Sequence, residues 1–239
     1  DLKGYNAAFP NGPIHMHLAE QIAEVAEVEA QWGARPVTWA LDHMDMNERW
    51  CLIHCTQMTP SETVALAQSG AVAGLCPITE SSLGDGIFDG VRWLDQSGAI
   101  AIGSDSNIRI SLSEELRTLD YSQRLRDGTR AALASPKKST GRRLFDDVVK
   151  GGAQASGRST GQISTGYWAD MFALDTTSEH LWGRAQDMAL DSWVFAGDDR
   201  LVTDVWSAGR HMVKGGEHVQ RGQIVAAYKR TIDALRDTL

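Results

Sequence analysis

Apolar residues in the first two thirds of the chain form short runs that alternate with segments of helical periodicity. The four runs with the pattern of buried strands are residues 13–19, 50–55, 71–77 and 99–103. Helical spacing follows over residues 20–32, 37–42, 59–68, 88–97, 113–125 and 141–155. A polar, glycine-containing loop is expected over residues 78–86. Nearly continuous apolar strands joined by helices are typical of a parallel sheet covered on both faces.

The pattern changes beyond about residue 160. Residues 167–175 have the pattern of a strand, and residues 204–213 predict a hairpin that turns at Ala208-Gly209. A helix with a polar face is expected over residues 224–239. The predicted organisation is therefore a set of βα units over residues 1–160, a β-sandwich segment over 161–222 and a C-terminal helix over 223–239.

The number of βα units limits the fold. Four units cannot close a barrel, and alone they would leave two bare sheet edges. The chain also opens with Asp1-Leu2-Lys3 and has no initiator methionine. We therefore expect an α/β fold that forms the C-terminal half of a (β/α)8 TIM-like barrel, with part of a small β-sandwich after it. The other half of the barrel is expected in a longer parent chain.

Composition excludes several classes of protein. The net charge of -8 and the pI of about 5.3 disfavour binding to nucleic acid, because few basic groups are available to neutralise phosphates. Three cysteines without a regular framework argue against a disulfide scaffold and are expected to be buried. No apolar run approaches the ~20 residues that a membrane span needs. We expect a cytoplasmic protein with a small-molecule substrate.

Polar residues with metal-binding chemistry follow three of the predicted strands. These residues are His17, His54 and Asp105, and the catalytic face of a TIM barrel lies at this end of its strands. Two imidazoles and a carboxylate that converge there predict a zinc site or a similar divalent site. Glu20 follows His17 closely enough to transfer a proton. Each residue alone has a simpler interpretation, such as a hydrogen-bonded histidine or a turn cap, but their common position favours a site.

Three motifs resemble the second half of the amidohydrolase superfamily, in its deaminase branch. They are His17-Leu18-Ala19-Glu20, Ile53-His54-Cys55 and Gly103-Ser104-Asp105-Ser106, which match the HxxE of strand 5, the His of strand 6 and the Asp of strand 8. Residues 166–175 resemble the return of that superfamily into its β-sandwich. Within the branch, residues 15–21, 48–56, 70–77, 80–88, 103–107 and 114–117 are similar to the formimidoylglutamate deiminases.

The resemblance implies one divalent metal ion, with zinc expected. His17 and Asp105 would hold it together with a strand-1 histidine pair that this chain lacks. Asp105 would accept a proton from water, Glu20 would carry a proton to the leaving nitrogen, and His54 would hydrogen-bond the attacking oxygen.

His15 shares a strand face with His17, because alternate residues of a strand point the same way. Both could be ligands, or the pair could be the strand-1 motif itself. His54 would then come too early to be the strand-5 histidine, so we expect His17 to be the ligand and His15 to point into the barrel. Substrate contacts are predicted for His15, Asn107 and Arg109.

The resemblance implies hydrolysis of N-formimino-L-glutamate to N-formyl-L-glutamate and ammonia, a step of histidine degradation, by a homodimer. An aminohydrolase of a nucleobase or nucleoside such as guanine is the alternative, and Leu83-Gly84-Asp85-Gly86 favours the deiminase over it. A second alternative is an inactive truncated fragment or subunit, because two protein ligands bind zinc weakly.

Overall fold

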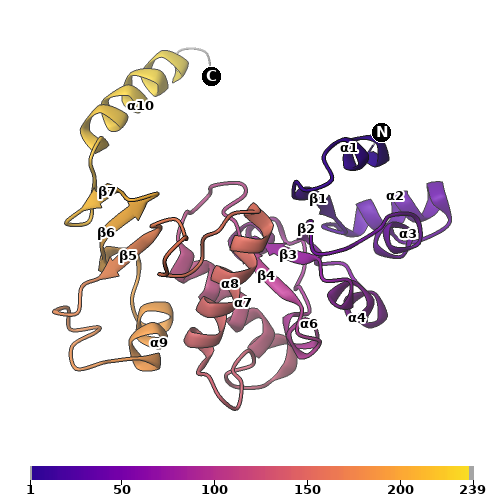
Figure 1. Cartoon of the computed structure of the whole chain (residues 1–239), viewed down its shortest axis with the longest axis horizontal. Helices are drawn as coiled ribbons and strands as arrows, with labels where there is room; N and C mark the ends of the chain where they lie inside the picture. The colour runs from indigo at the N-terminus through magenta and orange to yellow at the C-terminus, as the bar shows by residue number, and fades with distance from the viewer. Residues whose placement is uncertain (1, 237–239) are drawn as a thin grey trace.

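The computed structural model describes residues 2–236 and contains two separate sheets (Figure 1). The first is a four-stranded parallel sheet in the order β1-β2-β3-β4. Its strands are β1 (Ile14–Leu18), β2 (Trp50–His54), β3 (Val72–Leu75) and β4 (Ala99–Ile102). These strands lie within the four predicted runs, so the predicted α/β fold with a parallel sheet is confirmed. The sheet is open, with β1 and β4 at its edges, and no barrel closure is seen among the described residues.

Eight helices accompany this sheet in the described part of the chain. They are α1 (Leu2–Ala8), α2 (Ile22–Trp32), α3 (Pro36–His43), α4 (Pro60–Gln68), α5 (Pro77–Leu83), α6 (Gly90–Asp95), α7 (Leu112–Asp127) and α8 (Thr140–Ser156). Local sequence explains several of their ends. For example, α4 begins with a capping box between Thr59 and Glu62, and Pro60 occupies its first turn. No helix within residues 2–236 is both long enough and apolar enough to cross a membrane.

Helix α5 corrects the prediction of a loop over residues 78–86. Two buried carboxylates satisfy the N–H groups at its start: Cys76 N donates to Glu80 Oε1 at 2.8 Å, and Ile78 N donates to Glu115 Oε2 at 2.9 Å. Glu115 belongs to α7, so half of this capping comes from a distant part of the chain. The short local sequence therefore gave too weak a signal for a helix.

The main core lies between the parallel sheet and the helices. Leu52, Leu75 and Ile100 point to this covered face and are almost completely buried. Burial of each such side chain contributes roughly 1.5–3 kcal/mol. Helix α8 packs closely on β4, because a Cβ atom at Gly151 would overlap the backbone of Ile100.

The C-terminal region, predicted to be a β-sandwich segment over residues 161–222, contains both strands and a helix. It holds an antiparallel sheet of β5 (Met171–Leu174), β6 (Val202–Ser207), β7 (Arg210–Lys214) and β8 (Glu217–His218). Between β5 and β6 lie α9 (Asp187–Phe195) and a 3-10 turn, η1 (Asp199–Leu201). Helix α9 was not predicted because its stability comes from tertiary contact: Trp193 and Val194 are buried where α9 packs on α8.

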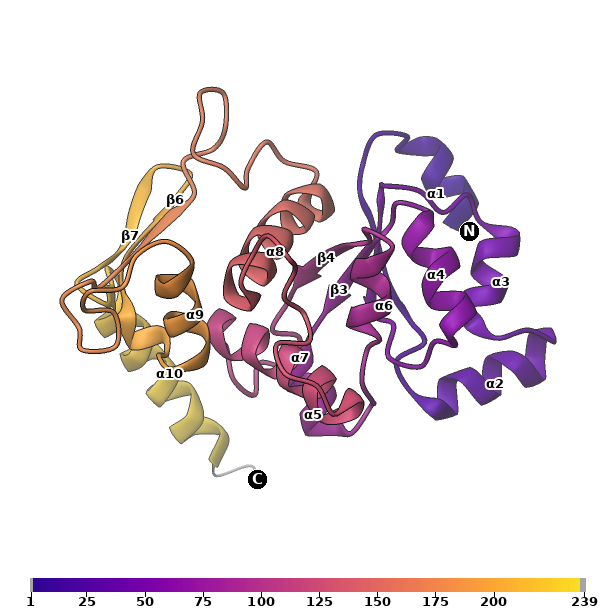
Figure 2. The same cartoon turned by 90° about the horizontal axis from the view of Figure 1, so that it is seen from below.

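The last helix, α10 (Arg221–Arg236), extends away from both sheets (Figures 1 and 2). It has no buried residue in the described part of the chain. The polar-faced helix predicted at the C-terminus is therefore present over residues 221–236, and residues 237–239 lie outside the described range.

Candidate functional site

Three side chains from separate strands meet at the carboxyl edge of the parallel sheet. His17 lies near the end of β1, His54 is the last residue of β2, and Asp105 follows β4. One ligand atom from each side chain lies within 4.8 Å of those of the other two. The sequence-based prediction that these residues converge is confirmed.

The backbone at His54 has an unusual conformation that bears on this convergence. His54 pairs in register with Leu18, so a regular pleat would point both side chains to the helix-covered face. Instead, His54 has a φ of 73° and Cys55 a φ of 53°. The left-handed backbone reorients His54, and its ring lies 5.2 Å from that of His17 between centroids. Such conformations cost about 1–3 kcal/mol each and cluster at functional sites.

His54 lies between two carboxylates. Its Nδ1 atom is 3.3 Å from Glu80 Oε1, and its Nε2 atom is 3.8 Å from Glu20 Oε1. Burial lowers the pKa of His54, but the hydrogen bond with Glu80 and the charge of Glu20 outweigh that effect and raise the pKa overall. The imidazole is only 1% exposed.

Glu20 is the candidate proton carrier, and its carboxylate is partly exposed beside His54. Burial raises the pKa of Glu20, His54 opposes that shift, and the nearby Asp85 charge adds to it. The turn that presents Glu20 is held by Glu24, which accepts hydrogen bonds from the backbone N–H groups of Ala19 and Glu20 at 2.8 and 2.7 Å. A carboxyl group that has a raised pKa and lies beside candidate metal ligands is suited to exchange protons.

Asp105 is presented by a tight turn after β4. It has a φ of 39°, and Asn107 N donates to Ser104 O at 2.9 Å. Asn107 also accepts a hydrogen bond from the Ser104 hydroxyl through Oδ1 at 2.9 Å. Arg109 forms an ion pair with Glu114. Asn107 and Arg109 are therefore near Asp105 in sequence but outside the three-residue cluster, and their predicted substrate contacts stay a prediction.

His15 is also outside the cluster. It is exposed on the same face as His17, as predicted from the strand period. Its Nε2 atom lies 2.8 Å from the carbonyl oxygen of Ala155, near the C-terminus of α8. This contact ties His15 to α8 and provides no support for a role in substrate binding.

Two buried acidic residues, Glu80 and Asp85, lie beside the cluster but were not predicted as site residues. Glu80 contacts His54 as described above. Asp85 accepts a hydrogen bond from Gln21 Nε2 at 3.0 Å, and its backbone carbonyl accepts one from Gln57. The Oδ2 atom of Asp85 is buried and has no hydrogen-bond partner among the described residues. Both residues lie in segments that carried the family resemblance, which was the only sequence signal that could have drawn attention to them.

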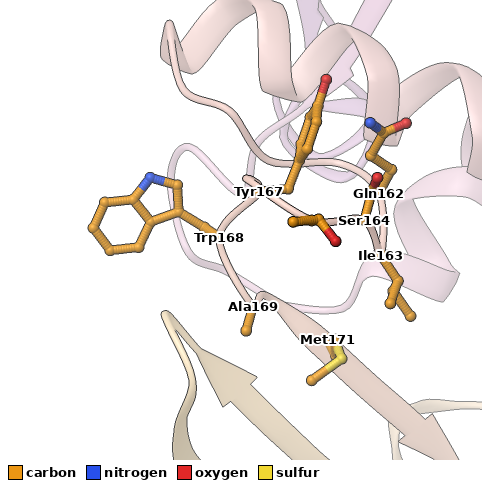
Figure 3. Close-up of a pocket in the computed structure, with 8 residues that line it drawn as sticks. Gln162, Ile163, Ser164, Tyr167, Trp168, Ala169 and Met171 are labelled. Atoms are coloured by element: carbon orange, nitrogen blue, oxygen red, sulfur yellow. The ribbon is translucent and has the colours of Figure 1, made fainter.

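A separate surface pocket lies just before β5 (Figure 3). Its volume is about 340 Å³, and its lining comes from residues 162–171. The lining includes Tyr167 and Trp168 but no carboxylate, imidazole or thiol. This pocket therefore lacks the carboxylate, imidazole and thiol groups that bind a metal ion.

The fold agrees with comparisons to known proteins. The family model described as "Amidohydrolase family" matches residues 6–212, so the chain belongs to the amidohydrolase family. It is 43% identical to a formimidoylglutamate deiminase from Pseudomonas aeruginosa over 226 residues, which are 94% of this chain and 50% of the relative. The chain thus spans about half the length of that curated relative.

The chain also covers about half of the solved structures that it matches. The crystal structure of an amidohydrolase from Brucella melitensis matches with a TM-score of 0.92 and 43% identity, over 98% of this chain and 52% of the other. An adenosine deaminase from Xanthomonas campestris with bound zinc matches with a TM-score of 0.86 and 25% identity, over 98% of this chain and 53% of the other. Both likenesses extend over nearly the whole of the present chain.

Proposed function

We propose that the complete protein in which this sequence occurs is a metal-dependent deiminase that hydrolyses N-formimino-L-glutamate to N-formyl-L-glutamate and ammonia. The convergence of His17, His54 and Asp105 is the observation that carries this proposal. The 43% identity to a formimidoylglutamate deiminase supports the choice of substrate. In this proposal, the chain forms half of a (β/α)8 barrel, and the other half supplies the remaining metal ligands.

The residues present fit a divalent ion. Two imidazoles and a carboxylate suit zinc, and the related adenosine deaminase was solved with zinc bound. We assign His17 and Asp105 as the ligands from this chain. When bound, such an ion supplies Lewis-acid polarisation and lowers the pKa of water toward ~7.

The remaining roles follow from the positions of the side chains. Asp105 accepts the proton of the attacking water, and Glu20 delivers a proton to the departing nitrogen. His54 faces Glu20 through Nε2 and stabilises the oxygen that becomes negatively charged. Water attacks the formimino carbon and forms the new C–O bond, both hydrogens of the water pass to the terminal nitrogen, and cleavage of the bond between that nitrogen and the carbon leaves the formyl group and ammonia.

An aminohydrolase of a nucleoside or nucleobase is the second candidate, because an adenosine deaminase has the same fold at 25% identity. The substrate separates the two candidates. Ammonia release should be measured with the complete protein on N-formimino-L-glutamate, guanine, cytosine and adenosine. We expect turnover of N-formimino-L-glutamate alone, reduced about 10²- to 10⁴-fold by Glu20→Gln. Turnover of a nucleobase or nucleoside instead would replace the substrate but keep the class of reaction.

A further inference from the structure

We propose that Glu80 is a positioning residue that fixes the tautomer of His54, with hydrogen on Nδ1 and with Nε2 directed to the reaction site. The inference deepens the proposed function and rests on it for the chemistry that Nε2 performs. The geometry of the hydrogen bonds, however, can be tested without any substrate.

The role of Glu80 follows from what its Oε1 atom already binds. The backbone N–H of Cys76 donates to this oxygen at 2.8 Å. The same oxygen lies 3.3 Å from His54 Nδ1. A carboxylate oxygen carries no hydrogen and accepts both contacts, so the hydrogen of the second contact belongs to His54 Nδ1. His54 therefore keeps a hydrogen on Nδ1 in both its neutral and its charged form, and only Nε2 exchanges its proton.

The opposite side of the ring faces the other site residues. Nε2 is 3.8 Å from Glu20 Oε1, and His54 supplies one of the three clustered ligand atoms. In the neutral ring, the Nδ1 hydrogen leaves a lone pair on Nε2. Nε2 can then take up a proton, which the other tautomer could not do, and the charged ring donates Nε2–H to an oxygen that becomes negatively charged.

Glu80 is held firmly enough to act in this way. It lies in the short helix α5 and is only 4% exposed. The neighbouring Thr79 bonds Ser106 at 2.9 Å between hydroxyl oxygens, which connects α5 to the turn that carries Asp105. One helix therefore contacts both His54 and the Asp105 turn, and a carboxylate behind a histidine is a common way to orient that ring.

Two substitutions separate the hydrogen bond from the charge. Glu80→Gln keeps an oxygen that can accept from both Cys76 N and His54 Nδ1, whereas Glu80→Leu removes the acceptor. Glu115→Gln is the matched control, because Glu115 is a buried carboxylate that also caps α5 but has no hydrogen bond to His54. The readouts are histidine ¹⁵N NMR of the complete protein, assigned with His54→Asn, and kcat and KM for N-formimino-L-glutamate.

We expect the wild type, Glu80→Gln and Glu115→Gln to carry hydrogen on His54 Nδ1 and to have similar kcat values. Glu80→Leu should lose this preference and about 10- to 100-fold in kcat, with a smaller change in KM. Hydrogen on Nε2 alone in the neutral wild-type ring would overturn the proposal, even if Glu80→Leu does not fold. Unchanged tautomer and kcat in folded Glu80→Leu would also overturn it. An Nδ1–H without turnover of N-formimino-L-glutamate would support the positioning and refute the proposed substrate.

Discussion

The two sheets differ in how completely the described chain covers them. Every residue of β3 and all but one of β2 are buried, whereas no residue of β5, β6, β7 or β8 is. Helices and neighbouring strands within the chain bury the central parallel strands. The antiparallel sheet remains half-buried at best. The parallel region therefore contains most of the main core, while the antiparallel sheet adds partly buried side chains such as Phe172 and Leu174 to it.

A similar contrast between buried and exposed residues occurs within the parallel sheet, at the strand that carries His17 of the candidate site. The edge strand β1 alternates between covered residues and the exposed His15 and His17. The histidines face the side of the sheet that carries only the small apolar cluster of Cys51, Val72, Ala101 and Ala155. Polar groups that a buried strand could not tolerate are thus placed where a ligand can reach them.

The largest expected effect separates the two histidines of β1. In the complete protein, His17→Ala should lose the bound ion and reduce turnover by more than about 100-fold. Loss of a metal ligand should reduce activity at least as much as loss of a residue that only orients a ligand. His15→Ala should retain the ion. Metal content by mass spectrometry and ammonia release provide the measurements. Loss of the ion from His15→Ala but not from His17→Ala would reverse our ligand assignment.

A matched pair of leucines tests the contrast between the sheets. Leu75 ends β3 and is fully buried, whereas Leu174 ends β5 and is only half-buried. In this chain, Leu75→Ala should lower the free energy of unfolding by about 2–5 kcal/mol. We expect a loss of roughly 1 kcal/mol for Leu174→Ala. Equal losses of unfolding free energy in urea would show that the antiparallel sheet is as well covered in solution as the parallel sheet, which would contradict this difference between them.

Glu115 gives the parallel region a pH dependence of its own. Burial raises its pKa from 4.5 to about 7, although the hydrogen bond from Ile78 opposes the shift. Between these values the folded state binds more protons than the unfolded chain, so this group destabilises the fold progressively as pH rises. Relative to wild type, Glu115→Gln should gain on the order of 1–3 kcal/mol in stability between about pH 5 and pH 8. A relative stability that is constant or falls with pH would contradict this origin of the shift.

The smallest effect is expected at the C-terminus. Deletion of residues 221–239 removes α10, none of whose described residues is buried. The midpoint of urea unfolding should therefore change by an amount equivalent to no more than ~0.5 kcal/mol. A larger loss would mean that α10 packs on the rest of the chain in solution.

The sequence predicted those features that depend on local pattern. The four parallel strands follow from continuous apolar runs, and the convergence of His17, His54 and Asp105 follows from their common place at strand ends. Helices α5 and α9 escaped prediction because distant residues stabilise them: Glu115 caps α5, and α8 buries Trp193.

The sequence predicted which residues form the cluster better than it predicted how their side chains are oriented. The left-handed backbone at His54 and its contact with Glu80 depend on how β2 and α5 meet in space. A period-two strand pattern would have placed the His54 side chain on the opposite face. The residue types in the cluster were therefore predictable, but the orientation of the imidazole was not.

Anomalous X-ray diffraction at the zinc edge, from crystals of the complete protein with zinc, tests the central claim most directly. We predict a single strong peak at about 2.0–2.2 Å from a ring nitrogen of His17 and from a carboxylate oxygen of Asp105. Ordered His17 and Asp105 side chains with no peak between them, or with the zinc bound elsewhere, would contradict the assignment of this sheet edge as the catalytic metal centre.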